Sequence, residues 1–279
     1  MKYCVNLGCC SKRLPAKELL PLVKDAGFDA CFLDGGNGDE LRAMAAEIRK
    51  EGLILQSIHA PFNEVHRMWE TGPEGDRVQA SLTRYLEDCA SAGAPMMVCH
   101  VFIGFGEEHP NSVGVERFGA LVKRAEELGM KIAFENTEGE SYLQTVKQHL
   151  WSSPAAGFCI DTGHEMCYNR SRDLIRAYGA DGKLFCTHLN DNLGITGETI
   201  TWKDDAHLLP FDGVADWEGI ASRLCDVGYD GVLTMELTLH NKPDRHTHDR
   251  YDALTTAEFL SEARSRAERL AHLMEAAKK

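Results

Sequence analysis

The chain has 279 residues, of which 43% are hydrophobic and 26% are charged, and its formal net charge is −13. This composition is typical of a soluble globular enzyme and excludes a disordered chain, and no apolar run approaches the roughly 18 residues of a membrane span. The acidic balance argues against a nucleic-acid partner, because surfaces that bind phosphates usually carry basic patches.

Short apolar runs rich in β-forming residues alternate with helical runs along the whole chain. The predicted strands are 3–8, 28–34, 53–59, 96–102, 131–136, 157–161, 183–188 and 231–237. The predicted helices are 15–27, 38–52, 76–93, 116–129, 140–150, 171–182, 216–228 and 251–277. Several of these helices end in glycine, which is a helix stop signal.

This alternation predicts an α/β fold, a single parallel (β/α)8 TIM barrel that spans residues 1–279 as one domain. The chain length agrees, since such barrels typically contain about 250 residues, and no linker or low-complexity tract divides the sequence. An open doubly wound sheet is the alternative, but no Gly-x-Gly-x-x-Gly motif follows the first strand.

Six consecutive predicted strands end in or reach a polar side chain, namely His59, His100, Glu135, Asp161, His188 and Glu236. In a (β/α)8 barrel these strand ends form one rim, where the active site is built. Residues two positions earlier point the same way, one layer down. They are all small: Ser57, Val98, Ala133, Cys159, Cys186 and Thr234. The pattern therefore predicts a polar pocket above a floor of small side chains.

Four of these rim residues combine three carboxylates with one imidazole: Glu135, Asp161, His188 and Glu236. Crowded carboxylates repel one another, and a divalent cation removes this repulsion. Three oxygen donors and one nitrogen donor suit Mn²⁺, Mg²⁺ or Co²⁺ better than a thiolate-type zinc site. We therefore expect one divalent metal ion, with Mn²⁺ preferred and Mg²⁺, Co²⁺ or Zn²⁺ as alternatives.

Six motifs carry a family resemblance: SIHAPF (57–62), AFENTEG (133–139), CIDTGH (159–164), THLNDN (187–192), DDAHLLPFDGVADW (204–217) and GYDGVLTMEL (228–237). With these motifs the chain resembles the xylose isomerase-like TIM-barrel superfamily. That superfamily contains sugar and sugar-phosphate isomerases and epimerases, and also the apurinic endonucleases of the endonuclease IV type. The motifs are specific for the superfamily and discriminate poorly among its members.

The resemblance to ketose 3-epimerase-like members implies a metal held by the four residues named above. It also implies that Glu135 and Glu236 carry proton transfers on opposite sides of the substrate, with His164 beside the substrate oxygens. We expect His59, His100 and His207 to bind substrate as well, with a purely structural role inside the barrel as the alternative for His59 and His100. The chemistry agrees, because chelation of a carbonyl and its neighbouring hydroxyl acidifies the C–H between them through an enediolate. The expected function is a metal-dependent isomerase or epimerase for a sugar, sugar phosphate or inosose.

Two other functions remain open. The endonuclease IV type uses three zinc ions, and all nine matching residue types are present: His59, His100, Glu135, Asp161, His164, His188, Asp205, His207 and Glu236. The acidic, glycine-rich loop 33–40 argues against it, because an enzyme that kinks duplex DNA needs basic or wedge residues there. A catalytically inert sugar-binding barrel is the third function. An aspartic protease is disfavoured because Asp-Thr-Gly occurs once.

The remaining features concern location and partners. Ten cysteines without a Cys-x-x-Cys pair, and a start without a signal-peptide pattern, predict reduced thiols and a cytoplasmic location. We expect a small sugar or polyol-type substrate, no membrane partner, and a homo-oligomer as one option. Lys242 or Arg245 either holds a substrate phosphate or belongs to a solvated lid. Asn190 and Asp191 either orient metal ligands or are turn residues.

Overall fold

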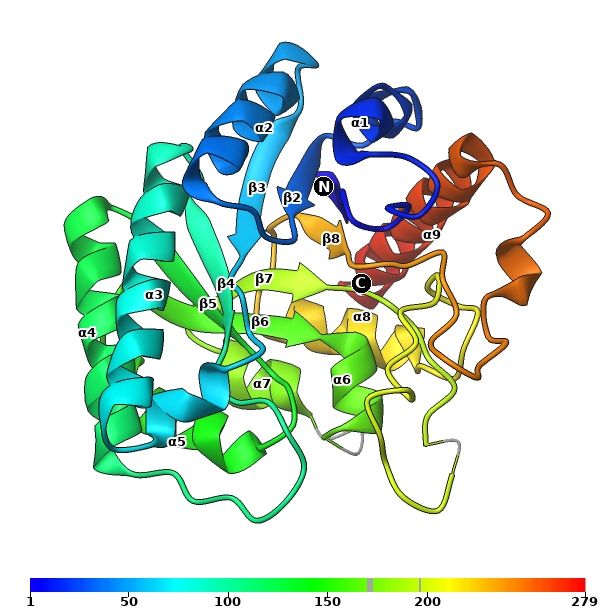
Figure 1. Cartoon of the computed structure of the whole chain (residues 1–279). Helices are drawn as coiled ribbons and strands as arrows, with labels where there is room; N and C mark the ends of the chain where they lie inside the picture. Colours follow the sequence, from blue (N-terminus) through cyan, green and yellow to red (C-terminus); the bar gives the residue numbers. More distant parts are fainter. Residues whose placement is uncertain (170–172, 196, 279) are drawn as a thin grey trace.

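The computed structural model describes residues 1–169, 173–195 and 197–278. Its strands are β1 (Tyr3–Asn6), β2 (Ala30–Leu33), β3 (Ile54–His59), β4 (Met96–His100), β5 (Lys131–Glu135), β6 (Ala156–Asp161), β7 (Leu184–His188) and β8 (Leu233–Met235). They are hydrogen-bonded in the order β7-β6-β5-β4-β3-β2-β1-β8. Leu189, directly after β7, forms a parallel bridge to Met235 of β8 and closes the ring. The predicted (β/α)8 barrel is confirmed (Figure 1).

The helices surround the strands (Figure 1). They are α1 (Ala16–Asp25), α2 (Gly38–Lys50), α3 (Pro73–Ser91), α4 (Ser112–Leu128), α5 (Glu140–Leu150), α6 (Thr162–Cys167), α7 (Leu174–Gly179), α8 (Trp217–Asp226) and α9 (Thr256–Ala277), with 3-10 turns at Val65–Trp69 and Asp249–Tyr251. Helix α9, drawn in red, packs against α8 and against α1, so the last helix of the chain contacts the first.

The helix boundaries differ from the predicted ones where a capping residue decides them. The last helix begins at Thr256 rather than 251, because Thr255 and Glu258 form a reciprocal capping box. Helix α4 begins earlier than predicted, since Asn111 accepts a hydrogen bond from the Gly114 amide. The predicted helix 171–182 is reduced to α7, and its positions 171 and 172 lie outside the described residues. Helix α6 was not predicted.

Side chains alternate between the barrel interior and the helical layer, as the predicted strands require. The interior holds a small cluster of Met96, Val98, Ala133, Cys159 and Cys186. The intervening residues Ile58, Cys99, Phe134, Ile160 and Met235 belong to the main core between strands and helices. The residues predicted to form the floor are small, but the interior also contains Met96 and Phe32, whose ring stacks on His188.

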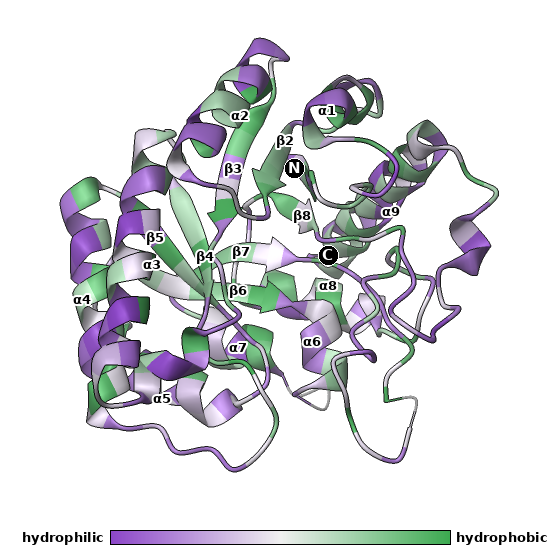
Figure 2. Cartoon of the chain, in the orientation of Figure 1, coloured by the Kyte–Doolittle hydropathy of each residue, from purple (hydrophilic) through white to green (hydrophobic). Residues whose placement is uncertain are grey.

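The distribution of hydropathy follows the same layers. Figure 2 shows mostly hydrophobic strands at the centre and helices that alternate between hydrophilic and hydrophobic residues around them. In the part of the chain that the structure describes, no helix combines the length and apolar character needed to cross a membrane. The apolar surface of the helices is used for packing on the barrel.

Candidate functional site

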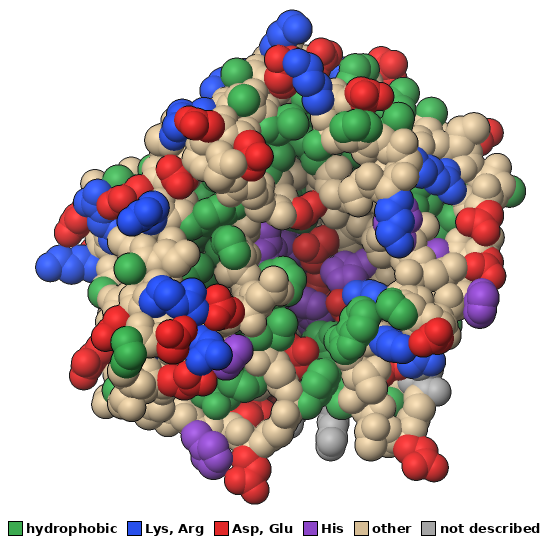
Figure 3. Space-filling model, in the orientation of Figure 1, with side chains coloured by type: hydrophobic (Ala, Val, Ile, Leu, Met, Phe, Trp, Pro, Cys, Tyr) green, Lys and Arg blue, Asp and Glu red, His purple; other side chains and the backbone are tan. Residues whose placement is uncertain are grey.

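A cavity of about 850 Å³ lies at the C-terminal ends of the strands. Figure 3 looks into this hollow, where histidine and acidic side chains gather. Phe62, Ile103, Tyr168 and Trp202 contribute apolar and aromatic surface to its walls. Its volume lies within the range of about 300–1,000 Å³ that is typical of small-molecule sites.

The four predicted metal ligands converge beneath this cavity, and Glu236 lines it. One donor atom from each of Glu135, Asp161, His188 and Glu236 lies within 4.8 Å of the others. The first three are fully buried, whereas the Glu236 side chain is 15% exposed and lines the cavity. Metal–ligand bonds of about 2.0–2.2 Å place opposite donors about 4 Å apart, so this spacing fits one cation.

The strand register explains why these residues meet. Glu135, Asp161 and His188 are the last residues of β5, β6 and β7, and Asp161 is paired directly with His188 across the two strands. Glu236 follows β8, and its amide donates to the carbonyl of Leu189 at the point where the barrel closes. Closure therefore brings the end of β8 to the ends of β5, β6 and β7.

Glu135 is enclosed by imidazoles on both sides of its carboxylate. Its Oε1 lies 2.9 Å from Nδ1 of His188, and its Oε2 lies 3.0 Å from Nε2 of His59 and 3.2 Å from Nε2 of His100. Burial alone would raise the pKa of Glu135, but the charge of His188 and hydrogen bonds from the three histidines hold that pKa well below its usual range. Glu135 thus joins two groups of donors.

A third group contains His164, Asp205 and His207. Oδ2 of Asp205 lies 2.8 Å from Nε2 of His207 and 3.4 Å from Nε2 of His164. His207 has a φ of 53°, in the left-handed region that side chains other than glycine rarely adopt. Such backbone strain clusters at functional sites. All nine candidate residues therefore lie in three adjacent groups.

Three of the histidines are held in one tautomer by backbone carbonyls. Nδ1 of His59 lies 2.8 Å from the Ala60 oxygen, Nδ1 of His164 lies 2.8 Å from the Asn136 oxygen, and Nδ1 of His207 lies 3.1 Å from the Glu236 oxygen. A carbonyl only accepts, so Nδ1 carries the proton and a neutral ring has its lone pair on Nε2. Each Nε2 faces a carboxylate, which also only accepts. A proton or a cation must lie between them, as in histidine–metal sites.

The pKa values of the carboxylates diverge. Burial raises the pKa of Asp161 to about 7, although His164 and His207 oppose this shift. Burial also acts to raise the pKa of Glu236, but the charge of His188 outweighs it and lowers that pKa to about 2. Burial lowers the pKa of His100 to about 4, in spite of its hydrogen bond to Glu135. The carboxylates of the four-residue group lie beside imidazoles, and this donor set fits a divalent cation.

Asn190 and Asp191, two and three residues after His188, have definite structural roles. Asn190 donates from Nδ2 to Oδ2 of Asp161 at 2.7 Å and so orients a predicted ligand. Asp191 accepts from Nε1 of Trp217 at 2.8 Å and from the amides of Phe211 and Ala215. These contacts anchor the loop between β7 and α8, which carries Asp205 and His207 into the cavity.

Lys242 and Arg245, the two residues predicted to hold a substrate phosphate or to belong to a lid, point to different places. Nζ of Lys242 lines the cavity, 3.6 Å from Oδ2 of Asp205 and 5.5 Å from the centre of the Trp202 ring. Arg245 is directed instead toward Asp204, at 3.4 Å. Sequence reasoning missed Tyr168, whose ring centre lies 5.0 Å from that of His164 in the cavity wall. Its position four residues after His164 was the available signal, because such residues share one face of a helix.

The sequence of this chain matches a known family. The family described as xylose isomerase-like TIM barrel matches residues 20–263. The uncharacterized protein y4fM of Sinorhizobium fredii (strain NBRC 101917 / NGR234) is 27% identical over 296 residues, covering 90% of this chain and 91% of that protein.

Solved structures show the same fold. The IOLI protein with a zinc atom is 18% identical, with a TM-score of 0.73 over 99% of both chains. D-psicose 3-epimerase in the presence of D-fructose is 16% identical, with a TM-score of 0.71 over 98% of this chain and 99% of that one. The resemblance drawn from the motifs is confirmed, since the family match covers most of the chain. The chain belongs to the xylose isomerase-like TIM-barrel family.

Proposed function

We propose that this protein is a divalent-metal-dependent isomerase or epimerase that moves a proton at a carbon beside the carbonyl of a sugar or polyol-type substrate. The observation that carries the proposal is the group of Glu135, Asp161, His188 and Glu236, whose last member lines the cavity. The similarity to D-psicose 3-epimerase and to the zinc-containing IOLI protein supports this class of reaction.

The four-residue group would hold the cation. When bound there, a divalent ion supplies Lewis-acid polarisation of a carbonyl and so acidifies the adjacent C–H. Asp161 is oriented for this role by the Asn190 amide on Oδ2 and by the His164 amide on Oδ1, at 2.7 and 2.6 Å. The polar floor and the apolar walls would exclude water around a substrate of sugar size.

The two glutamates differ in their access to a substrate. Glu236 lines the cavity as an ionised carboxylate beside His188, so one of its oxygens can take a proton from a substrate carbon. Glu135 is fully buried, and its Oε2 lies beside His59 and His100, which do line the cavity. We propose that these imidazoles connect Glu135 to the substrate side, where they also bind substrate hydroxyl groups.

The test is proton exchange with solvent. Ketoses and inososes are incubated with the enzyme and Mn²⁺ in D₂O, and deuterium at the carbon next to the carbonyl is followed by NMR. Each acid–base step is typically worth about 10² to 10⁴ in rate, so Glu236→Gln and Glu135→Gln should lower exchange at least about 100-fold. The exposed Glu116→Gln on α4 is the matched control and should exchange at the wild-type rate. Wild-type exchange in Glu236→Gln would remove Glu236 from this role.

A second candidate function is hydrolysis of a phosphate ester at a centre of three metal ions. The observation that favours it is that His59, His164 and His207 direct Nε2 lone pairs at carboxylates in groups beside the four-residue group. Metal content separates the candidates. About one metal ion per chain after purification without added metal supports the isomerase, and about three, with incision of duplex DNA at an abasic site, supports hydrolysis.

A further inference from the structure

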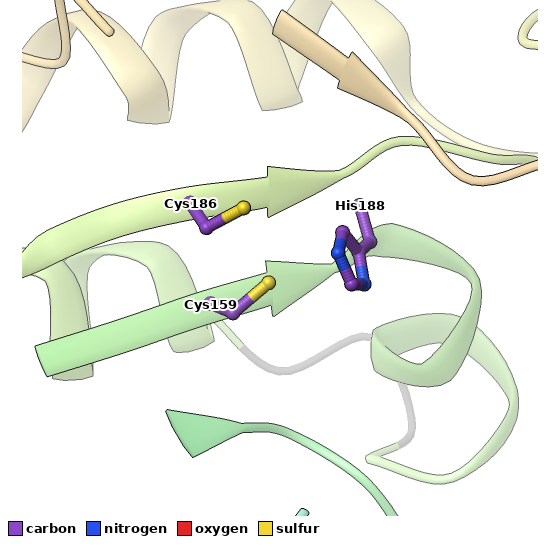
Figure 4. A group of neighbouring side chains, drawn as sticks. All are labelled: Cys159, Cys186 and His188. Atoms are coloured by element: carbon purple, nitrogen blue, oxygen red, sulfur yellow. The ribbon is translucent and has the colours of Figure 1, made fainter. Parts of the chain in front are cut away.

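A different group of donors lies beneath the carboxylates, inside the barrel. It consists of Cys159, Cys186 and His188, whose donor atoms lie within 4.8 Å of one another. Figure 4 shows that the sulfur atoms of both cysteines lie on the side of their strands that faces the His188 ring. All three residues are fully buried. We refer to these three residues as the thiol group.

The position of the thiol group follows from the strand register. Cys159 of β6 is paired directly with Cys186 of β7, just as Asp161 is paired with His188 two residues later. Because side chains alternate along a strand, both sulfurs point into the barrel, one layer below the carboxylates. They belong to the cluster of small interior residues rather than to the core under the helices.

The two ring nitrogens of His188 serve different layers of the barrel: Nδ1 faces the carboxylates, and Nε2 is left for the thiol group. Its Nδ1 lies 2.9 Å from Oε1 of Glu135, whereas its buried Nε2 has no hydrogen-bond partner among the described residues. The sulfur atoms of Cys159 and Cys186 each lie within 4.8 Å of a nitrogen of the His188 ring. Phe32 stacks on the ring with centres 4.8 Å apart and fixes its plane. A buried polar atom without a partner is costly and points to an absent ligand.

The surroundings of Cys186 favour a thiolate, which is the form that binds metal. Nε2 of Gln56 donates to the sulfur of Cys186 at 3.2 Å. Oε1 of Gln56 in turn accepts from Ser57 at 2.5 Å, which holds the amide in this orientation. Hydrogen bonds of this kind around a metal site orient the ligands and tune their basicity.

We propose that the sulfurs of Cys159 and Cys186 and Nε2 of His188 form a buried site for a thiophilic d¹⁰ cation, Zn²⁺ or Cu⁺. Two thiolates and an imidazole select such soft ions over Mg²⁺ or Mn²⁺, which prefer oxygen. The His188 ring then links this site to the oxygen-rich group through Nδ1. This site does not depend on the isomerase reaction, but it shares His188 with the four-residue group, so loading both sites makes the ring a bridge between two cations and adds one metal ion to the content expected for the isomerase.

The experiment uses the full chain with reduced thiols under anaerobic conditions, with Mg²⁺ in excess, and titrates Co²⁺ as a spectroscopic substitute for Zn²⁺. We expect about one equivalent of Co²⁺ to produce the intense near-ultraviolet absorption of a cobalt–thiolate bond, and Zn²⁺ to remove it. Cys159→Ala and Cys186→Ala should each weaken the thiolate-linked binding at least about tenfold. Cys99→Ala is the matched control, because Cys99 is equally buried but belongs to the core under the helices.

The outcomes separate this proposal from the isomerase. Glu236→Gln should lose Mn²⁺ affinity and proton exchange but keep the cobalt–thiolate absorption. Absence of that absorption in the reduced wild-type protein, or its full retention in both cysteine variants, overturns the thiol site and leaves the isomerase untouched. Circular dichroism checks that each variant is folded. The wild-type titration and the conservative Cys159→Ser and Cys186→Ser variants decide the matter if an alanine variant does not fold.

Discussion

Asn190 illustrates how a single side chain sets the geometry of the candidate metal site. It is fully buried, and its Nδ2 donates to Oδ2 of Asp161 at 2.7 Å. Its own backbone is fixed by Thr162, whose Oγ1 donates to the Asn190 carbonyl and accepts from the Asn190 amide. With the His164 amide on the other oxygen, Asp161 has no freedom to rotate. Asn190 therefore orients Asp161, and its role as the orienting residue of a metal ligand stays a prediction.

We predict that Asn190→Ala lowers the affinity for Mn²⁺ about 10- to 100-fold, because the Asp161 carboxylate loses the hydrogen bond that orients it. Calorimetric titration of the metal-free protein measures the affinity. Asn63→Ala, an exposed residue at the cavity mouth, is the control and should bind like wild type. Equal Mn²⁺ affinity in Asn190→Ala and wild type would mean that Asp161 needs no support.

The junction of β6 and α6 is the element on which the site depends most. Helix α6 has only six residues, and the Asp161 side chain caps it by accepting from the His164 amide. Packing at this junction is tight, since a Cβ on Gly163 would lie 2.0 Å from Oδ1 of Asn190. The chain therefore needs glycine at 163 for space, and the helix places His164 and Tyr168 on the cavity wall.

We predict that Gly163→Ala destabilises the protein by about 1–3 kcal/mol, because Asn190 must move and overpacking strains a filled interior. Gly119→Ala, inside helix α4, is the matched control. Its Cβ would lie 3.6 Å from Cδ2 of Leu150, an ordinary contact, so the better helix former should stabilise by about 0.5–1 kcal/mol. Urea unfolding measures both free energies. A Gly163→Ala variant as stable as wild type would contradict the assigned packing.

For the whole molecule, the buried charges make stability depend on pH. Burial alone would lower the pKa of His207, but the adjacent Asp205 carboxylate outweighs it and raises that pKa from 6.5 to about 9. A histidine whose pKa is raised by folding contributes stability that is complete below its unfolded pKa and is lost as the pH rises through its folded pKa. The relevant window therefore runs from about pH 6.5 to pH 9.

We predict that the metal-free protein loses up to about 3 kcal/mol of unfolding free energy between pH 6.5 and 9 through this residue. Urea unfolding of chelator-treated protein at several pH values measures the profile. His207→Gln cannot take up the proton and should show a shallower decline across the same window. A wild-type profile that is flat or rises over this range would show that the His207–Asp205 pair is not charged as described.

The sequence predicted the barrel and most of its elements, but not helix α6. The alternation of strands and helices predicted the barrel, and the polar residues at strand ends predicted that Glu135, Asp161, His188 and Glu236 meet. Both predictions succeed for a local reason: parallel strands bring their C-terminal ends to one rim, and side chains alternate with a period of two. Helix α6 was missed because six residues carry almost no periodic signal, and its start depends on a capping contact.

Other features depended on the tertiary structure alone. The two sides of the Glu135 carboxylate face different histidines, and three imidazoles are fixed by backbone carbonyls of distant or neighbouring residues. The thiol group exists because Cys159 and Cys186 are in register and lie under His188. The sequence by itself determined which residues face the interior, because that is local. The tertiary structure decided which donor atoms lie close enough to share a cation. Register shifts between strands, the Asp191 contacts that anchor the loop after β7, and barrel closure at Leu189 set these distances, and each of them joins residues far apart in the chain.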